Sequence, residues 1–133
     1  MTKIRNLYTG DFEINASTKM LYPYIFSPSG LSQWFADDVS VDEDHIYNFF
    51  WDNEDHKAKM VTHRTNHYVK FEFLPENEGD EEDPLYFEIR LELNDLTQSV
   101  FIKITDYSDL EDNEEAHDLW SSLIENLKET VGG

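Results

Sequence analysis

The chain has 133 residues and a formal net charge of −19, because 29 Asp and Glu outnumber 10 Lys and Arg. The length fits one domain over residues 1–133, and the acidity argues against binding to nucleic acid or to anionic membranes, which need a basic surface. Aromatic residues make up 14% of the chain, so we expect a packed core rather than an acidic disordered tail.

The chain contains no cysteine, which excludes disulfides, thiolate catalysis and cysteine-bearing metal centres. No apolar run approaches the roughly 18 residues that span a bilayer. The start, Met1–Tyr8, has no apolar signal segment. We therefore expect a soluble, cytoplasmic protein without membrane insertion.

The first third of the chain predicts one strand followed by two short helices. Apolar and polar residues alternate across 11–15, which is typical of a strand with one buried face. Ser17 or Thr18 can cap a helix, which Pro23 should shorten or kink. After a turn rich in Ser, Pro and Gly, the segment 31–35 predicts a second helical turn with two large aromatic side chains.

The middle of the chain predicts a run of antiparallel strands, because apolar residues alternate with a period of two almost to Asp106. The first candidate strand is weak and could be a loop, so five or six strands are expected. One face of the sheet should be a core face, since Val69, Phe71 and Phe73 alternate with Lys70 and Glu72. The predicted strands are 39–41, 45–51, 57–65, 68–74, 85–93 and 99–105, and an acidic loop, 76–83, joins two of them.

The segment 113–131 predicts one long amphipathic helix. Acidic residues precede or open its first turn and Lys128 lies in its last turn, as the helix dipole favours. At 1.5 Å per residue the helix would be roughly 28 Å long, enough to cross the concave face of a curved sheet. Trp120 should lie buried between helix and sheet. The apolar stripe consists of Ala116, Leu119, Trp120, Leu123, Ile124, Leu127 and Val131.

Several short motifs carry a resemblance to a known family. They are Ala16-Ser17 after the opening strand, Pro28 before Leu31-x-x-Trp34-Phe35, the aromatic run Phe49–Trp51, and Trp120 in the last helix. In this order they resemble the START-like (SRPBCC) superfamily, and within it the branch of the activator-of-Hsp90 homologues. The acidic segments 76–83 and 106–115 are more charged than the resemblance leads one to expect.

The resemblance implies an α+β helix-grip fold. In that fold a curved antiparallel sheet wraps around a long C-terminal helix, and two short helices lie between the first two strands. Members of the superfamily include lipid carriers, polyketide cyclases, plant hormone-binding proteins and chaperone cofactors. The fold alone therefore leaves the function open.

The gap between a curved sheet and a long helix either holds a packed core or encloses a ligand cavity. We expect non-catalytic binding of a hydrophobic or amphipathic small molecule there. The alternatives are that these residues are simply core and the domain is a protein-interaction module with an acidic surface, or, third, a cyclase-like or hydrolase-like enzyme. The expected lining residues are Trp34, Trp51, Phe71, Phe73, Phe87, Ile89, Trp120, Leu123 and Leu127.

Catalytic, metal and cofactor sites have little support in the sequence. His63 and His67 have the spacing of a helical zinc pair, but they fall at a predicted hairpin and lack further ligands. The acidic runs lack the ligand spacing of a calcium-binding loop. No nucleophile motif or phosphate-binding loop is present. We therefore assign no catalytic residue, no metal ligand and no cofactor.

The segment 45–51 is apolar on both faces, with Tyr47, Phe49 and Trp51 on one and Ile46 and Phe50 on the other. A one-layer sheet normally exposes one face to water. Either the short N-terminal helices or a second copy of the chain should therefore cover the second apolar face of this strand. A monomer or a weak homodimer is expected.

Overall fold

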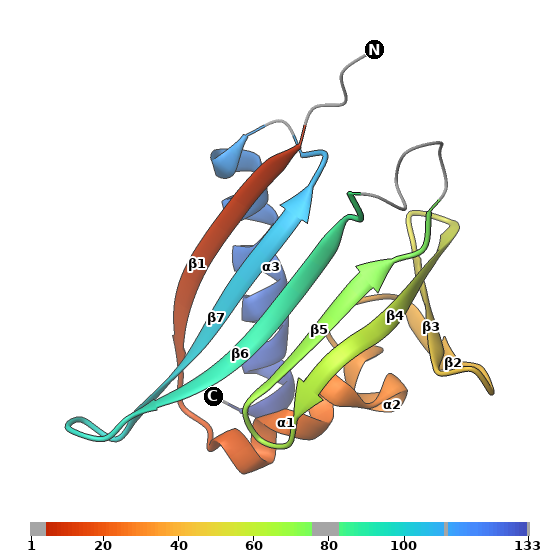
Figure 1. Ribbon diagram of the computed structural model, residues 1–133. Helices are drawn as coiled ribbons and strands as arrows, with labels where there is room; N and C mark the ends of the chain where they lie inside the picture. The colour runs from red at the N-terminus through yellow and green to blue at the C-terminus, as the bar shows by residue number, and fades with distance from the viewer. Residues whose placement is uncertain (1–4, 76–82, 111, 133) are drawn as a thin grey trace.

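The computed structural model describes residues 5–75, 83–110 and 112–132, and these form a curved seven-stranded antiparallel sheet with helices on one side (Figure 1). Strands 2 to 7 follow each other in chain order, and the first strand pairs with the last, at the far edge. The elements are β1 (Asn6–Ile14), α1 (Thr18–Phe26), α2 (Pro28–Leu31), β2 (Asp38–Val41), β3 (Ile46–Trp51), β4 (Glu54–Arg64), β5 (Tyr68–Phe73), β6 (Tyr86–Asn94), β7 (Ser99–Ser108) and α3 (Asn113–Val131).

The two short helices lie where they were expected, although the second begins earlier. The Ser17 hydroxyl accepts from the Met20 N–H at 3.0 Å and caps α1, which accommodates Pro23 in its interior. The second helical element, predicted over 31–35, begins three residues earlier. Ser27 caps a helix at Pro28–Leu31, because proline is well suited to a first helical position, and residues 32–35 continue it as a turn in which the Phe35 N–H donates to the Leu31 carbonyl.

The strands follow in the predicted order, and the weak candidate at 39–41 is a strand, so six strands follow the opening one. The opening strand, predicted over 11–15, begins five residues earlier, at Asn6. Two later strands also differ in their bounds. Asp52 and Asn53 both have positive φ, 53° and 61°, and form a two-residue hairpin turn, so β4 begins at Glu54 rather than 57. At the other end β7 continues to Ser108, so the acidic run predicted from residue 106 begins inside a strand. The predicted acidic loop 76–83 lies, apart from Asp83, outside the described residues.

Helix α3 has the predicted bounds. The Asp112 carboxylate accepts from the Glu115 N–H at 2.8 Å, and Gly132, with φ of 77°, terminates the helix in the left-handed conformation. Trp120 is 2% exposed, which confirms its predicted burial between helix and sheet. The buried stripe is narrower than predicted, since Leu119 is exposed.

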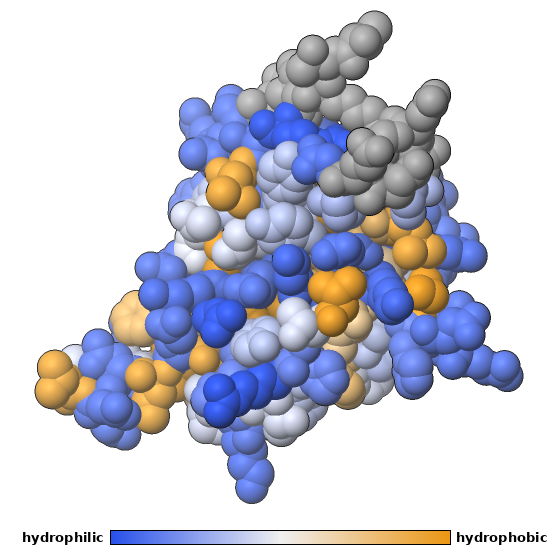
Figure 2. All heavy atoms as spheres, in the orientation of Figure 1, coloured by the Kyte–Doolittle hydropathy of each residue, from blue (hydrophilic) through white to orange (hydrophobic). Residues whose placement is uncertain are grey.

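The core lies between the sheet and the three helices. In Figure 1 helix α3 lies behind β1, β7 and β6, whereas α1 and α2 lie across one end of the sheet. This arrangement buries Tyr47 and Phe49 on one face of β3 and leaves Ile46 and Phe50 half-buried on the other. The opposite, convex face of the sheet is mainly hydrophilic, with scattered apolar residues (Figure 2).

Candidate functional site

A cluster of aromatic rings fills the space between the sheet and the segment after α2. Its centre is Phe35, whose ring centroid lies 4.9 Å from Phe87, 5.2 Å from Phe49 and 5.8 Å from Trp120. The tilted and edge-to-face geometries are those that aromatic pairs prefer. We call the following set the aromatic cluster: Trp34, Phe35, Phe49, Trp51, Phe71, Phe73, Phe87 and Trp120.

Backbone contacts hold the two adjacent aromatic residues after α2 in place. The Phe35 N–H donates to the Leu31 carbonyl at 2.9 Å, and the Trp34 indole N–H donates to the Tyr24 carbonyl at 2.8 Å. The remaining rings come from alternate positions of β3, β5 and β6, which point to one face of the sheet, and from α3. Segments far apart in the sequence thus meet at Phe35.

The predicted lining residues belong to this core. Most are buried, and three are half-buried, namely Trp51, Phe73 and Leu123. Phe35 is not among the predicted lining residues, although its ring contacts several of them, including Trp51, Phe87 and Trp120. The buried members of the predicted set are Trp34, Phe71, Phe87, Ile89, Trp120 and Leu127.

The aromatic cluster reaches the surface at one edge. The His56 ring stacks on Trp51 with centroids 4.4 Å apart, and Trp51 lies 6.2 Å from Phe73. On α3, Leu123 packs against the core and Leu119, one turn earlier, is 46% exposed. We call Trp51, His56, Phe73, Leu119 and Leu123 the aromatic rim.

Two flanks of α3 face different parts of the molecule. Thr130, on the same flank as Leu119 and Leu123, donates its hydroxyl to the Asn126 carbonyl at 2.8 Å, and its oxygen lies 3.4 Å from the Gln33 carbonyl, just before the aromatic residues of the cluster. On the other flank His117 meets the Tyr8 hydroxyl of β1 at 2.7 Å. The two leucines of the rim therefore lie on the side of the cluster rather than on the side of β1.

A second group of residues, the polar latch, joins α3 to β1 and β7. The Trp120 indole N–H donates to Asp106 Oδ2 at 2.6 Å, and the Tyr8 hydroxyl bonds to His117 Nδ1. Asp106 is 7% exposed, and burial raises the pKa of its carboxyl, an effect that its hydrogen bonds with Trp120 and Ser108 oppose. Burial, and secondly the charge of Asp106, raises the pKa of the Tyr8 hydroxyl.

Asp106 was not predicted to face inward, although the sequence carries a signal for it. The signal was present in the alternation Val100, Ile102, Ile104, which Asp106 continues on the same face of β7. Its neighbours in the sequence are polar or acidic, and this similarity made it look like the first residue of a loop. Because its carboxylate engages the helix indole, we assign the latch a role in orienting α3.

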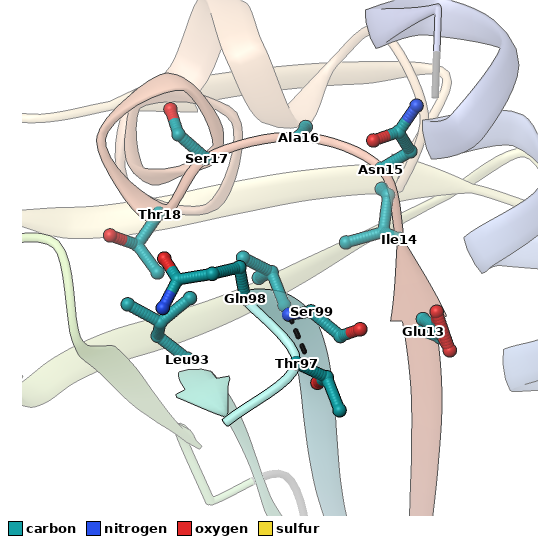
Figure 3. A pocket seen from close by; sticks show the side chains of 11 residues that line it. Glu13, Ile14, Asn15, Ala16, Ser17, Thr18, Leu93, Thr97, Gln98 and Ser99 are labelled. Carbon is teal, nitrogen blue, oxygen red and sulfur yellow. Dashed lines mark hydrogen bonds between the residues drawn. The ribbon is translucent and has the colours of Figure 1, made fainter. Parts of the chain in front are cut away.

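Hollows on the surface of the described residues include two that contain no predicted lining residue. The smaller, about 310 Å³, lies beside β2, β3 and β4. The larger, about 630 Å³, lies between the junction of β1 with α1 and the β6–β7 hairpin (Figure 3). We call the larger one the hairpin hollow. It is lined by Glu13, Ile14, Asn15, Ala16, Ser17, Thr18, Leu93, Thr97, Gln98, Ser99 and Val100.

The histidines are dispersed. His63 bonds to the Tyr22 hydroxyl at 3.2 Å, while His67 belongs to the β4–β5 turn. Within residues 5–75, 83–110 and 112–132, no three His, Asp or Glu side chains are placed to hold a metal ion. Over the same ranges no helix has the length and apolarity needed to cross a membrane.

Comparison with known proteins identifies the family. The model of the START-like superfamily domain matches residues 2–133. The chain belongs to the START-like superfamily. This confirms the family and the α+β fold that the sequence motifs implied. No curated protein matches the chain.

Solved structures agree on the fold. A protein from Bacteroides fragilis is 31% identical, with 95% of this chain and 90% of that chain covered and a TM-score of 0.62. The Aha1 dimer from Colwellia psychrerythraea is 19% identical, with 95% and 96% covered and a TM-score of 0.73. A Bacillus thuringiensis protein is 13% identical, with 96% and 100% covered and a TM-score of 0.74. The likeness to Aha1 is consistent with the activator-of-Hsp90 branch at the level of the fold.

Proposed function

We propose that this START-like domain is non-catalytic and binds the apolar part of a small hydrophobic or amphipathic molecule at the aromatic rim. The observation that carries the proposal is the contrast between the centre and the edge of the aromatic cluster. Phe35 occupies the centre, while Trp51, Phe73 and Leu123 at the edge are only half-buried. A flat apolar group can therefore stack at the rim without displacing the core.

The chemistry of the rim suits an uncharged or cationic amphiphile. Indole and phenyl faces bind apolar and cationic groups. The net charge of −19 repels anions, so a fatty-acid carboxylate should bind more weakly than a neutral lipid of similar size, and added salt should narrow that difference.

Tryptophan emission and thermal unfolding test the proposal with a panel of a sterol, a flavonoid, a monoacylglycerol and a fatty acid. At about a hundredfold excess over the dissociation constant, a bound ligand stabilises the fold by about 2.7 kcal/mol. Leu119→Ser should weaken this response. Leu7→Ser is a matched control, because Leu7 is 53% exposed on β1, away from the rim. No saturable response from any member would contradict the proposal.

Because Phe35 fills the centre of the aromatic cluster, a second candidate function is also favoured. The domain would then be a protein-interaction module that acts through its acidic surface. A basic partner protein would bind the exposed carboxylates, and its affinity would fall steeply as salt screens the charges. Binding of an uncharged amphiphile at the rim would not weaken with salt. The salt dependence of binding therefore separates the two candidates.

A further inference from the structure

Positive charge gathers on the convex face of the sheet, over β4 and β5. Residues 56–71 contain four Lys or Arg and no Asp or Glu, in a chain with 29 acidic and 10 basic residues. Ala58 and Val69 are fully buried, so the residues on either side of them in their strands point outward. Tyr68 therefore faces outward, and so does Arg64, which lies directly opposite it. The outward-facing cations of this segment are Lys57, Lys59, Arg64 and Lys70.

Three of these cations, Lys57, Lys59 and Arg64, form no ion pair within the residues that the structure describes. Glu72 lies directly opposite Lys59 on β5, yet the two charged groups do not come within ion-pairing distance. Because acidic residues greatly outnumber basic ones in this chain, unpaired cations are unexpected on its surface. Their N–H groups can donate to an anionic group of another molecule.

Two tyrosines lie among the cations on the same face. Arg64 and Arg90 are the cross-strand neighbours of Tyr68, one on each side, and the Arg90 guanidinium lies over the Tyr68 ring at 4.5 Å. The Lys70 ammonium lies over the Tyr86 ring at 4.4 Å. These contacts hold two long side chains against the sheet, which reduces the entropy lost when a partner binds. We call Arg64, Tyr68, Lys70, Tyr86 and Arg90 the convex patch.

The carboxylates on this face do not cancel its positive charge. Glu88 pairs with Arg90 at 3.3 Å, and Glu92 pairs with Lys103 of β7 at 3.2 Å. Over β4 to β7 the outward-facing side chains include six cations and four carboxylates, whereas the whole chain has a net charge of −19. The excess negative charge therefore lies elsewhere. The six cations are Lys57, Lys59, Arg64, Lys70, Arg90 and Lys103, and the four carboxylates are Asp55, Glu72, Glu88 and Glu92.

From these observations we propose that the convex patch binds an extended acidic segment of a partner protein. Guanidinium and ammonium groups pair with carboxylates, and Arg and Tyr are enriched where proteins bind each other. A nucleic acid or an anionic membrane presents a long array of negative charge, which the acidic remainder of the chain would repel. A short acidic segment meets only the patch. This surface lies on the opposite side of the sheet from the core, so the interaction is separate from binding at the aromatic rim.

Backbone amide chemical shifts of the full chain test the proposal, with an acetylated and amidated peptide of four Glu-Ser repeats as the probe. In an extended peptide the glutamates of this repeat point to one side. The titration runs to about 5 mM peptide, a range that detects weak binding. Salt at about 0.15 M shortens the screening length to about 8 Å, so that distant carboxylates of the chain act weakly. We expect saturable shifts at the amides of the convex patch, and much weaker binding of the matched peptide of Gln-Ser repeats.

Charge-removing variants locate the contact. Arg64→Gln and Lys70→Gln should each raise the dissociation constant about two- to fivefold, as expected for an exposed ion pair. Lys128→Gln is the matched control, because it changes the net charge equally but lies on α3, behind the sheet in Figure 1. It should leave the dissociation constant unchanged.

Several results would overturn the proposal. They are the absence of saturable shifts, shifts confined to another face of the molecule, an equal loss of affinity in Lys128→Gln, and equal binding of the Gln-Ser peptide. Vesicles of phosphatidylserine and phosphatidylcholine form a further arm of the test and should not bind. Vesicle binding that Arg64→Gln abolishes would assign the patch to a membrane instead and would also overturn the proposal.

Discussion

The concave face of the sheet is covered in two different ways. Over β3, β5 and β6, rings from Phe49, Phe71 and Phe87 pack around Phe35 through shape and ring geometry, without a hydrogen bond between them. Over β1 and β7, helix α3 is positioned by directional bonds from Asp106 and Tyr8. The aromatic half is therefore held together by the close packing of its rings. The half under α3 is held together by a few oriented hydrogen bonds between polar groups.

The two halves should therefore lose stability through different kinds of substitution. A packed aromatic half loses stability in proportion to the volume removed from it. The α3 half depends on whether buried polar atoms keep their partners. Trp120 belongs to both halves, since its ring contacts Phe35 while its indole N–H bonds to Asp106.

Trp120→Ala should have the largest effect because it damages both halves at once. We expect a loss of about 5 kcal/mol of unfolding free energy, the upper end for a buried aromatic residue, since Asp106 also loses its partner. Urea midpoints measure the loss. Trp120→Phe keeps most of the ring and removes only the N–H donor, so it should cost clearly less. Equal losses in the two variants would show that packing contributes little.

Phe35→Ala should come next, at about 3–4 kcal/mol, because it removes the centre of the aromatic half and leaves the α3 latch intact. The same urea titration applies. The variant also creates an apolar cavity, so a small aromatic such as benzene should raise its melting temperature and leave that of the parent chain unchanged. A destabilisation under about 1 kcal/mol would mean that the neighbouring rings collapse into the space.

Gly10→Ala should cost about 1–3 kcal/mol by overpacking the α3 half. A Cβ on Gly10 would overlap the Tyr8 hydroxyl and lie 2.8 Å from Tyr8 Cζ, because the Tyr8 side chain runs along β1 over this glycine to reach His117. Removing the hydroxyl with Tyr8→Phe should reduce the penalty of the glycine substitution. A double-mutant cycle in urea measures this coupling, and additive losses would contradict it.

Asp106→Asn should have the smallest effect and the opposite sign. Burial raises the pKa of the Asp106 carboxyl in the folded state. The protonated carboxyl therefore stabilises the fold, fully so at a pH below the ordinary aspartate pKa. This stabilisation is lost as the pH rises through the folded-state pKa. At pH 7 the buried carboxylate therefore costs stability, and the amide, which can still accept from Trp120, should gain on the order of 1 kcal/mol.

Unfolding in urea at pH 7 and at about pH 4, near the ordinary value for aspartate, provides the check for Asp106→Asn. The advantage of the variant should shrink at the lower pH. A variant less stable than the parent at pH 7 would show that the charged hydrogen bond to Trp120 outweighs the cost of burying the carboxylate.

The elements with local signals were predictable from the sequence. Helix α3 was predicted with its observed bounds, because Asp112 caps its start and Gly132 ends it. Residues whose role depends on distant segments were not. Nothing near Phe35 in the sequence distinguishes it from Trp34 as the centre of the aromatic cluster, since that role comes from β3, β6 and α3. Asp106 was misplaced because the polar and acidic residues that follow it, Ser108 and Asp109 among them, obscured the alternation of β7.

The order of strands in the sheet also has a consequence for the folding pathway. From β2 to β7 each strand pairs with its neighbour in the chain, so these hairpins can form by closing short loops. Strand β1 instead pairs Asn6 with Ser108 and Ile14 with Val100, which closes most of the chain into one loop. Non-local contacts of this kind slow folding. The edge strand β1 is thus the element whose docking carries the largest entropic barrier, and the meander from β2 to β7 is the natural template on which it docks.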